Sequence, residues 1–409
     1  MFRMTTLTRV AVLGAATALL ACSETRDLLG TNPPAGGEIF KSYVALGNSI
    51  TAGYQSGGIL DSTQRQSYAK LLAGQMGTQY HYAALSTPGC PPPIVNGLTG
   101  ARLGGAAAPP CALRISSSVT DVLNNVAVPG ARVLDPTSAS TVASNALTTF
   151  ILGGKTQVQR ALDANPTFAT IWIGNNDVLE AGASGILVPL AGVSPGIVST
   201  QAQFQTNYDA MIQQLTDSEP NIKGVLIGVV QVAGIPLYSS GALIAASPAA
   251  QAAISGGAGK PVTIDPNCTG SASLVSVPQL IQQIRANTHP PVISCQPGSV
   301  PGTLVGDIFV LDATEQATLG ATIAGYNTYI KNKADAIGFA YYDPNVLLAA
   351  QKASNAIPAF PNFASTTATY GTLISLDGIH PAAAAHKLIA NDLIGAINTK
   401  YGTTLTPIP

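Results

Sequence analysis

Short apolar runs alternate along the chain with segments in which apolar residues recur at helical spacing. The runs are almost continuously apolar, which is typical of strands buried on both faces of a parallel sheet. The segments between them have one apolar face and predict amphipathic helices. The predicted strands cover 43–47, 124–130, 168–177, 223–232 and 339–343, and the predicted helices cover 67–77, 156–166, 200–218, 314–338 and 381–402, with Pro381 in the first turn of the last helix.

This order of strands and helices predicts a three-layer α/β/α sandwich with a mostly parallel central sheet. In such folds the chemistry is found at the carboxyl ends of the strands. Small and polar residues follow three of the predicted strands, at Gly47–Ser49, Gly130 and Gly174–Asp177. We therefore expect a functional site where these strand ends meet.

Two stretches interrupt the alternation, at about 78–121 and 234–312. Both are rich in Gly, Pro, Ser and Ala, and each contains two cysteines. They offer little apolar material to hold them in place. We expect two loop insertions on the catalytic side of a single domain, 41–409, where they would form walls of the site.

The first residues of the chain are typical of an exported protein. Arg3 and Arg9 precede the apolar run "AVLGAATALLA", which is shorter than the ~20 residues that span a bilayer and fits a secretory signal. The run ends in Leu-Leu-Ala-Cys, which resembles the lipobox of bacterial lipoproteins. Residues 1–21 are thus the predicted signal peptide, Cys22 is the predicted lipidation site, and 22–40 would form a flexible tether. The alternative is an ordinary signal peptide with a chance cysteine.

A lipidated Cys22 would anchor the protein to the membrane of a bacterial cell envelope. Ser23 follows the cysteine where an aspartate would favour retention in the inner membrane, so the outer membrane is expected. The four remaining cysteines allow three pairings. We expect the local disulfides Cys90–Cys111 and Cys268–Cys295, because each would close one of the Pro- and Gly-rich insertions.

Composition excludes some classes of function. Charged residues make up only 10% of the sequence, hydrophobic residues make up 46%, and the net charge is −1. This balance argues against a nucleic-acid-binding surface and against wholesale disorder. The sequence has no Cys-x-x-Cys pair and its four histidines are scattered, so neither a metal site nor a cofactor is expected.

Three residues have the chemistry of a nucleophilic site. Ser49 follows a predicted buried strand, and Asp377 and His380 lie three positions apart just before the last helix. A serine nucleophile needs a base to take its proton, and the base needs a carboxylate to orient it. Acyl transfer also needs oxyanion donors, for which the Ser49 amide, Gly130 and the Asn176 side chain are candidates.

The stretches "GNSITAG", "NNVAVPGA", "IGNND" and "LDGIHP", in this order, resemble the four blocks of the SGNH/GDSL hydrolase family. The resemblance covers about 42–402, apart from the two insertions, and implies a flavodoxin-like sandwich. It implies Ser49 as the nucleophile, Gly130 and Asn176 as oxyanion donors together with the Ser49 amide, and Asp377 and His380 as the remaining catalytic pair.

The first block departs from the family pattern. Asn48 occupies the position of the aspartate in the letters GDSL. Because asparagine also has an acceptor oxygen, we expect this residue to keep the same role in the turn. Gly89, in "STPGCPPP", is a rival to Gly130 for the second block. Thr51 breaks the other familiar serine-hydrolase signature, Gly-x-Ser-x-Gly.

Together these features predict an exported serine esterase or lipase-like hydrolase that acts on a small-molecule or lipid ester. The alternatives are a catalytically inactive binding lipoprotein of the same fold and a carbohydrate O-acetyl esterase. Aromatic residues are only 6% of the chain, with one tryptophan, which favours lipid or small acyl esters over acetylated polysaccharide. The apolar segment 185–198 is either an acyl-binding wall or ordinary packing. The oligomeric state stays open.

Other residues have simpler interpretations. His81 and His386 have no carboxylate nearby in the sequence and are expected to be structural or solvent-facing, and His289 is expected in a loop. Trp172 lies inside an apolar run and is expected in the core. Asp177 is expected to brace the loop after its strand.

Overall fold

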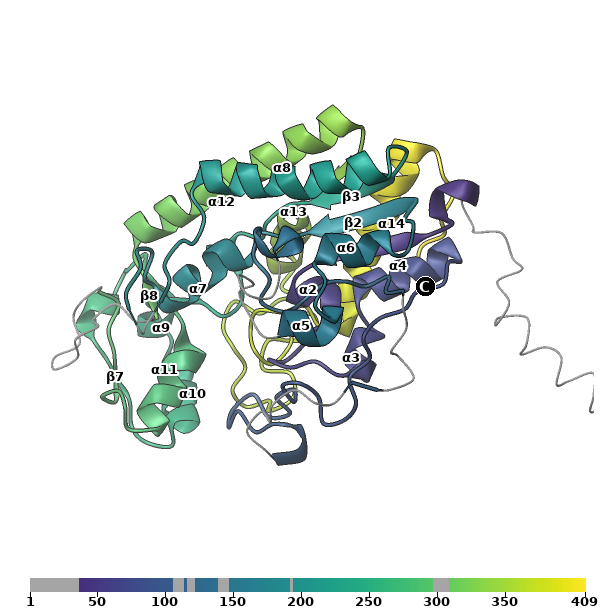
Figure 1. Ribbon diagram of the computed structural model, residues 1–409. Helices are drawn as coiled ribbons and strands as arrows, with labels where there is room; N and C mark the ends of the chain where they lie inside the picture. Colours follow the sequence, from purple (N-terminus) through teal and green to yellow (C-terminus); the bar gives the residue numbers. More distant parts are fainter. Residues whose placement is uncertain (1–36, 106–113, 116–121, 139–146, 192–193, 297–308) are drawn as a thin grey trace, which may run out of the picture.

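The computed structural model describes residues 37–105, 114–115, 122–138, 147–191, 194–296 and 309–409. A parallel sheet with the strand order β1-β2-β3-β9 lies at the centre, and helices pack on both of its faces (Figure 1). This arrangement confirms the predicted α/β/α sandwich. The strands are β1 (Tyr43–Gly47), β2 (Phe168–Trp172), β3 (Lys223–Ile227) and β9 (Ala340–Tyr342), and the main covering helices are α4 (Tyr68–Met76), α6 (Gln157–Leu162), α8 (Gln201–Ser218), α12 (Ala313–Ile337) and α14 (Ala383–Tyr401).

Alternate residues of each strand point to opposite layers of the sandwich. On one face, Val44 of β1 and Ile171 of β2 pack against α6, α8 and α12. On the other face, Tyr43 and Trp172 pack against α4 and α14. Both faces of the strands are covered, which is why their sequences are almost continuously apolar. Shorter helices complete the layers: α2 (Ser49–Ala52), α3 (Asp61–Gln64), α5 (Leu147–Leu152), α7 (Asn176–Ser184) and α13 (Pro344–Ala353).

Several predicted boundaries need correction. The stretch 124–130 is not a regular strand, although three backbone hydrogen bonds of 2.7–3.1 Å join 124–128 to Ala45 and Gly47 of β1. Pro129 has no N–H to continue this pairing. Strands β2 and β3 end five residues earlier than predicted, because the chain turns there into loops that reach the site. Pro381 precedes α14 rather than lying in its first turn.

The insertion 234–312 has a hydrophobic core of its own, which corrects the expectation that it has little apolar material. Ile244, Ile254, Leu280 and Ile293 are buried in this core. The insertion forms a lobe beside the sandwich (Figure 1). Its elements are β4 (Ser239–Ser240), α9 (Gly241–Ala246), α10 (Pro248–Ala258), β5 (Thr263–Ile264), β6 (Leu274–Val275), α11 (Val277–Arg285), β7 (Val292–Ile293) and β8 (Val310–Leu311).

One of the two predicted disulfides is present. Cys268 and Cys295 are bonded, with 4.9 Å between their Cα atoms, and both side chains lie in the core of the lobe. The predicted Cys90–Cys111 bond lies outside the described residues, because Cys111 does. Cys90 itself is buried beside α2.

The N-terminal predictions fall mostly outside the described residues, including the signal peptide, Cys22 and the tether up to residue 36. The last four residues of the predicted tether, Gly37–Phe40, form a 3-10 helix. Phe40 is buried, and its ring centroid lies 5.0 Å from that of Phe168. Ordered packing therefore begins before residue 41. In the part of the chain that the structure describes, no helix is both long enough and apolar enough to cross a membrane.

Candidate active site

The turn between β1 and α2 presents Ser49 as the first residue of that short helix. The Asn48 side chain caps the helix, since its Oδ1 accepts a hydrogen bond from the Ile50 N–H at 3.1 Å. This is the turn role expected for Asn48. Capping holds the backbone of the turn in place and lifts Ser49 from the carboxyl end of a buried strand.

Gln157 holds the same turn from the other side. Its side chain accepts from the Gly47 N–H at 2.9 Å and donates to the Gly47 carbonyl at 3.0 Å. A Cβ atom at Gly47 would lie only 2.6 Å from the Trp172 carbonyl, so only glycine allows β1 and β2 to approach this closely here. The position of Ser49 is thus determined by residues from three separate segments.

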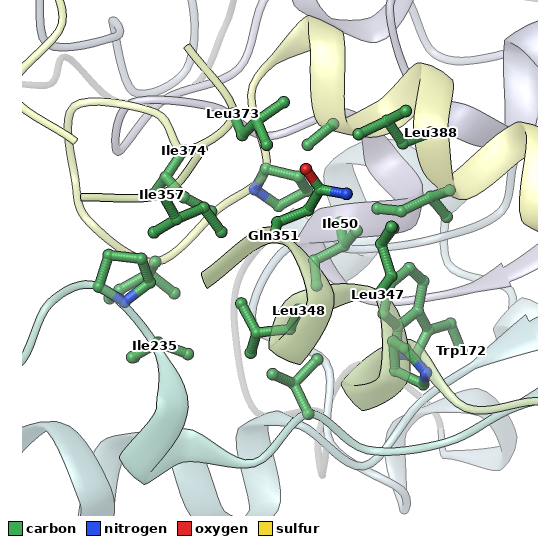
Figure 2. Close-up of a pocket in the computed structure, with 17 residues that line it drawn as sticks. Ile50, Trp172, Ile235, Leu347, Leu348, Gln351, Ile357, Leu373, Ile374 and Leu388 are labelled. Carbon is green, nitrogen blue, oxygen red and sulfur yellow. The ribbon is translucent and has the colours of Figure 1, made fainter. Parts of the chain in front are cut away.

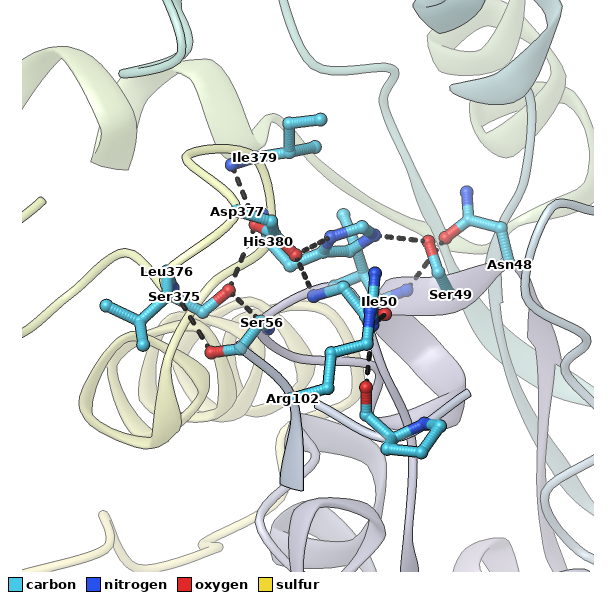
Figure 3. Close-up of polar contacts among 12 residues, drawn as sticks. Asn48, Ser49, Ile50, Ser56, Arg102, Ser375, Leu376, Asp377, Ile379 and His380 are labelled. Carbon is cyan, nitrogen blue, oxygen red and sulfur yellow. Dashed lines mark hydrogen bonds and ion pairs between the residues drawn. The ribbon is translucent and has the colours of Figure 1, made fainter. Parts of the chain in front are cut away.

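His380 lies between Ser49 and Asp377 (Figure 3). Its Nε2 is 2.8 Å from Ser49 Oγ, and its Nδ1 is 2.8 Å from Asp377 Oδ2. When the neutral ring carries its proton on Nδ1, it donates to Asp377 and accepts from the serine hydroxyl. The ring of Tyr54 covers the imidazole, with 4.9 Å between centroids. The three residues that the sequence suggested are therefore in direct contact.

The carboxylate of Asp377 accepts several further hydrogen bonds. The backbone N–H groups of Ile379 and His380 each donate to it at 2.9 Å, and the Gly57 N–H donates at 2.6 Å. Burial by itself raises the pKa of Asp377. The charge and ring hydrogen bond of His380 and the backbone N–H groups of His380 and Ile379 outweigh burial, and the pKa falls to about 2. Asp377 is consequently an anion whenever His380 works as a base.

A latch of two serines joins the loop after α2 to the loop that carries Asp377 (Figure 3). The Ser56 N–H donates to Ser375 Oγ at 2.8 Å, and the Leu376 N–H donates to Ser56 Oγ at 3.1 Å. The Ser375 hydroxyl in turn donates to Asp377 at 3.0 Å. We call this pair, Ser56 and Ser375, the serine latch.

Arg102, from the first insertion, supports the loop of the serine latch. Its Nη1 donates to the carbonyls of Gly57, at 2.7 Å, and of Pro92, at 2.6 Å. Neither Arg102 nor the serine latch was predicted from the sequence. A serine two positions before Asp377 was the one local signal available.

Two of the candidate oxyanion donors, Ser49 and Asn176, begin the helices α2 and α7, and the third, Gly130, lies in a loop. Ser49, Asn176 and His380 line one small pocket together with Asn175. The Asn176 amide donates one hydrogen bond to the Ala131 carbonyl at 2.8 Å, and its second N–H leaves a further donor. Gly130, directly before Ala131, has a φ of +82° that favours glycine. It is not among the lining residues of the pocket.

Gly89 and Asp177 make structural hydrogen bonds rather than contacts with the catalytic side chains. The Gly89 N–H donates to the Ser86 carbonyl within a local turn. Asp177 is fully buried, accepting from the Val133 N–H at 2.9 Å and from the Ser199 hydroxyl at 2.5 Å. It ties the first turn of α7 to the segment around Val133 and to Ser199.

His386 has a structural role and is buried in α14, in the helical layer that also contains α4. Its Nδ1 accepts from the Tyr68 N–H at 3.2 Å. Burial is the main cause that lowers its pKa, to about 3, so it stays neutral. Among the described residues, no three His, Cys, Asp or Glu side chains form a group that could hold a metal ion.

A serine, a histidine and an aspartate in contact at the carboxyl edge of a parallel sheet are the arrangement typical of serine hydrolases. The family model described as GDSL-like Lipase/Acylhydrolase matches residues 43–260, more than half of the chain. The chain belongs to this family of ester-hydrolysing enzymes, which confirms the resemblance of its sequence blocks. The last block, with Asp377 and His380, lies beyond the matched range.

The chain is similar to several solved structures, three of which follow. The extracellular lipase of Streptomyces rimosus is 14% identical, with a TM-score of 0.38 over 87% of this chain and 99% of that one. A carbohydrate esterase family 2 enzyme of Corynascus thermopiles is 15% identical, with a TM-score of 0.26 over 73% of this chain and 67% of that one. A family two carbohydrate esterase of Cellvibrio japonicus is 12% identical, with a TM-score of 0.24 over 73% of this chain and 63% of that one. No curated protein matches the chain.

Proposed function

We propose that the protein hydrolyses carboxylic esters through an acyl-enzyme on Ser49. The observation that carries the proposal is the pair of 2.8 Å contacts of the His380 ring, one with Ser49 and one with Asp377. An inactive binding protein would have no need to keep a serine, a base and a carboxylate in contact. The family description, lipase and acylhydrolase, agrees with this chemistry.

The reaction has two steps. Ser49 Oγ attacks the ester carbonyl carbon, and its proton passes to His380 Nε2. The carbon–oxygen bond to the alcohol then breaks, and the alcohol leaves with that proton. In the second step water attacks the acyl-enzyme, His380 takes a proton from the water and returns it to Ser49, and the carboxylic acid is released. Asp377 stabilises the imidazolium in both steps.

The developing oxyanion needs donors that are already in place. We assign this role to the backbone N–H groups of Ser49 and Gly130 and to the amide of Asn176. The support is that Asn176 shares a pocket with Ser49 and contacts the residue after Gly130.

Replacing Ser49 with alanine tests the proposal. We expect the Ser49→Ala variant to lose turnover of p-nitrophenyl acetate by at least about 10³-fold. A fluorophosphonate should label the wild-type protein at Ser49 and leave the variant unlabelled. Ser354→Ala, an exposed change at the end of α13, is the matched control and should keep both properties. Turnover that survives in Ser49→Ala would refute the assignment.

We also propose that the enzyme is exported and anchored by a lipid on Cys22, at the outer membrane of a bacterial envelope. The support is the apolar run that ends in Leu-Leu-Ala-Cys, followed by serine. Cys22→Ala should leave the precursor unprocessed or release it from the membrane fraction. Unchanged processing and unchanged fractionation of this variant would exclude the anchor.

A further inference from the structure

A second pocket, almost wholly apolar (Figure 2), adjoins the one that contains Ser49 and His380. The two pockets share four lining residues: Ile50, Val230, Ile235 and Ile379. Ile50 directly follows Ser49, and Ile379 directly precedes His380. Half of the residues shared by the two pockets are therefore immediate neighbours of the two reacting side chains.

Residues of this apolar pocket come from α13, α14 and the loop before α14. Leu347 and Leu348 contribute from α13, Leu373 from the loop and Ala385 from α14. Gln351 is the single lining residue with a hydrogen-bonding side chain apart from Trp172, and none is charged. The pocket has a cavity volume of about 80 Å³ and is partly open to solvent.

The wall formed by α13 is held in place by polar contacts behind it. The Asn345 side chain donates to the Val229 carbonyl at 3.0 Å and accepts from the Gln231 N–H at 2.7 Å. These bonds join the first turn of α13 to the segment that leaves β3. Leu347 and Leu348 thus face the pocket from a helix tied to the same strand end that carries Val230.

The described residues of the segment 185–198, which the sequence offered as an acyl-binding wall, line neither pocket. Leu187 and Ile197 pack against the main core instead. The apolar surface beside the reacting groups is built largely by residues of 344–389, together with Ile50, Trp172 and the segment after β3.

We propose that this pocket binds an apolar chain of the ester substrate while the ester carbonyl lies at Ser49, an inference that rests on the proposed function. A hydrocarbon chain gains free energy in proportion to the apolar area it buries, and it leaves no polar group without a partner. A sugar chain would find almost no hydrogen-bonding partners here, since Gln351 and the Trp172 indole are the only polar side chains in the lining. The enzyme would accordingly select esters of apolar acids or apolar alcohols over acetylated polysaccharide.

Two homologous series of esters test this selection with the full chain. One series varies the acyl group of p-nitrophenyl esters from acetyl to dodecanoyl, and the other varies the alcohol of acetate esters from ethyl to decyl. In one of the series kcat/KM should rise by up to about fourfold for each methylene that enters the pocket. A rise in the first series assigns the pocket to the acyl chain, and a rise in the second assigns it to the alcohol.

Pocket variants with matched controls complete the test. Ala385→Leu fills the pocket, and Leu348→Gln makes its wall polar. Either change should lower the ratio of kcat/KM for the preferred long ester to that for the shortest ester by at least about tenfold. The controls lie on the same two helices: Ala384→Leu at an exposed position, and Val346→Gln at a side chain that is 69% exposed. Both controls should keep the wild-type ratio.

The outcomes separate this inference from the proposed function. If wild-type turnover of the shortest ester depends on Ser49 but neither series depends on length, the pocket assignment is wrong and the hydrolase assignment stands. An unchanged ratio in both pocket variants, with their fold checked by circular dichroism, would also overturn it. Absence of any Ser49-dependent turnover would remove the proposed function and this inference with it. Variants on two different helices keep the test valid if one of them is unstable.

Discussion

The buried carboxylate of Asp377 depends on donors from two distant parts of the chain. Its own loop supplies the backbone N–H groups of Ile379 and His380 together with the Ser375 hydroxyl. The loop after α2 supplies the Gly57 N–H. A carboxylate that accepts this many hydrogen bonds is fixed in orientation, and it fixes the His380 ring in turn.

Ser375→Ala should remove one donor to Asp377 and leave the Ser56 N–H without its acceptor. Each such bond is worth ~1 kcal/mol, so we expect kcat for a short ester to fall about fivefold. KM should change little, because Ser375 lines neither pocket. Steady-state kinetics beside Ser354→Ala measures the effect. A loss confined to KM would contradict a positioning role for the serine latch.

Among the elements, the inserted lobe has a disulfide and a cluster of buried apolar residues in addition to its contacts with the main core. The Cys268–Cys295 disulfide joins the loop after β5 to the residues that follow β7, across 27 positions of sequence. Gly241, at the start of α9, packs so closely on it that an added Cβ would lie 2.5 Å from the Cys295 sulfur. The bond and the apolar core around it thus hold α9 against β7.

The double variant Cys268→Ala/Cys295→Ala should unfold the lobe more easily. Loop-closure entropy for a bond of this span corresponds to ~3–4 kcal/mol. Turnover of a short ester should stay within about twofold of wild type, because Ser49, His380 and Asp377 all lie outside the lobe. Hydrogen exchange over 238–296 measures the stability of the lobe, and kinetics on the same sample measure turnover. Equal loss of protection in the lobe and in β1–β3 would show that the two fold as one unit.

For the molecule as a whole, Asp177 links the stability of the fold to pH. Burial is the main cause that raises its pKa, to about 6, against the hydrogen bonds from Ser199 and Val133 that favour the carboxylate. An aspartate in an unfolded chain has a pKa of ~3.9. Between these values the folded protein binds a proton that the unfolded chain does not. The contribution of this group to the free energy of unfolding therefore falls as pH rises from about 4 to about 6.

Asp177→Asn should remove this dependence, since an amide does not titrate. The free energy of unfolding of wild type minus that of the variant should decrease by roughly 2 kcal/mol between pH 4 and pH 7. Urea unfolding of both proteins at several pH values in this range gives the difference directly. A difference that stays constant with pH, or increases, would contradict the raised pKa.

The sequence by itself determined the features that depend on local pattern: the strands, the family motifs and the place of the site. Continuous apolar runs located all four strands of the sheet, because a strand covered on both faces has no position for polar residues. The order of four short motifs identified the family and brought out Ser49, Asp377 and His380. Glycine and small polar residues after the strands indicated where a site would lie, since the carboxyl ends of parallel strands share one edge.

Tertiary structure alone decided which distant residues meet. The serine latch joins positions more than three hundred residues apart, and no local pattern in either segment carries that information. The apolar pocket likewise combines α2, the segment after β3, α13 and α14. In the sequence, an apolar residue on a helix looks the same whether it covers the core or lines a pocket, because periodicity reports only that one face avoids water. Which of these faces meets Ser49 depends on how the helices pack around the sheet.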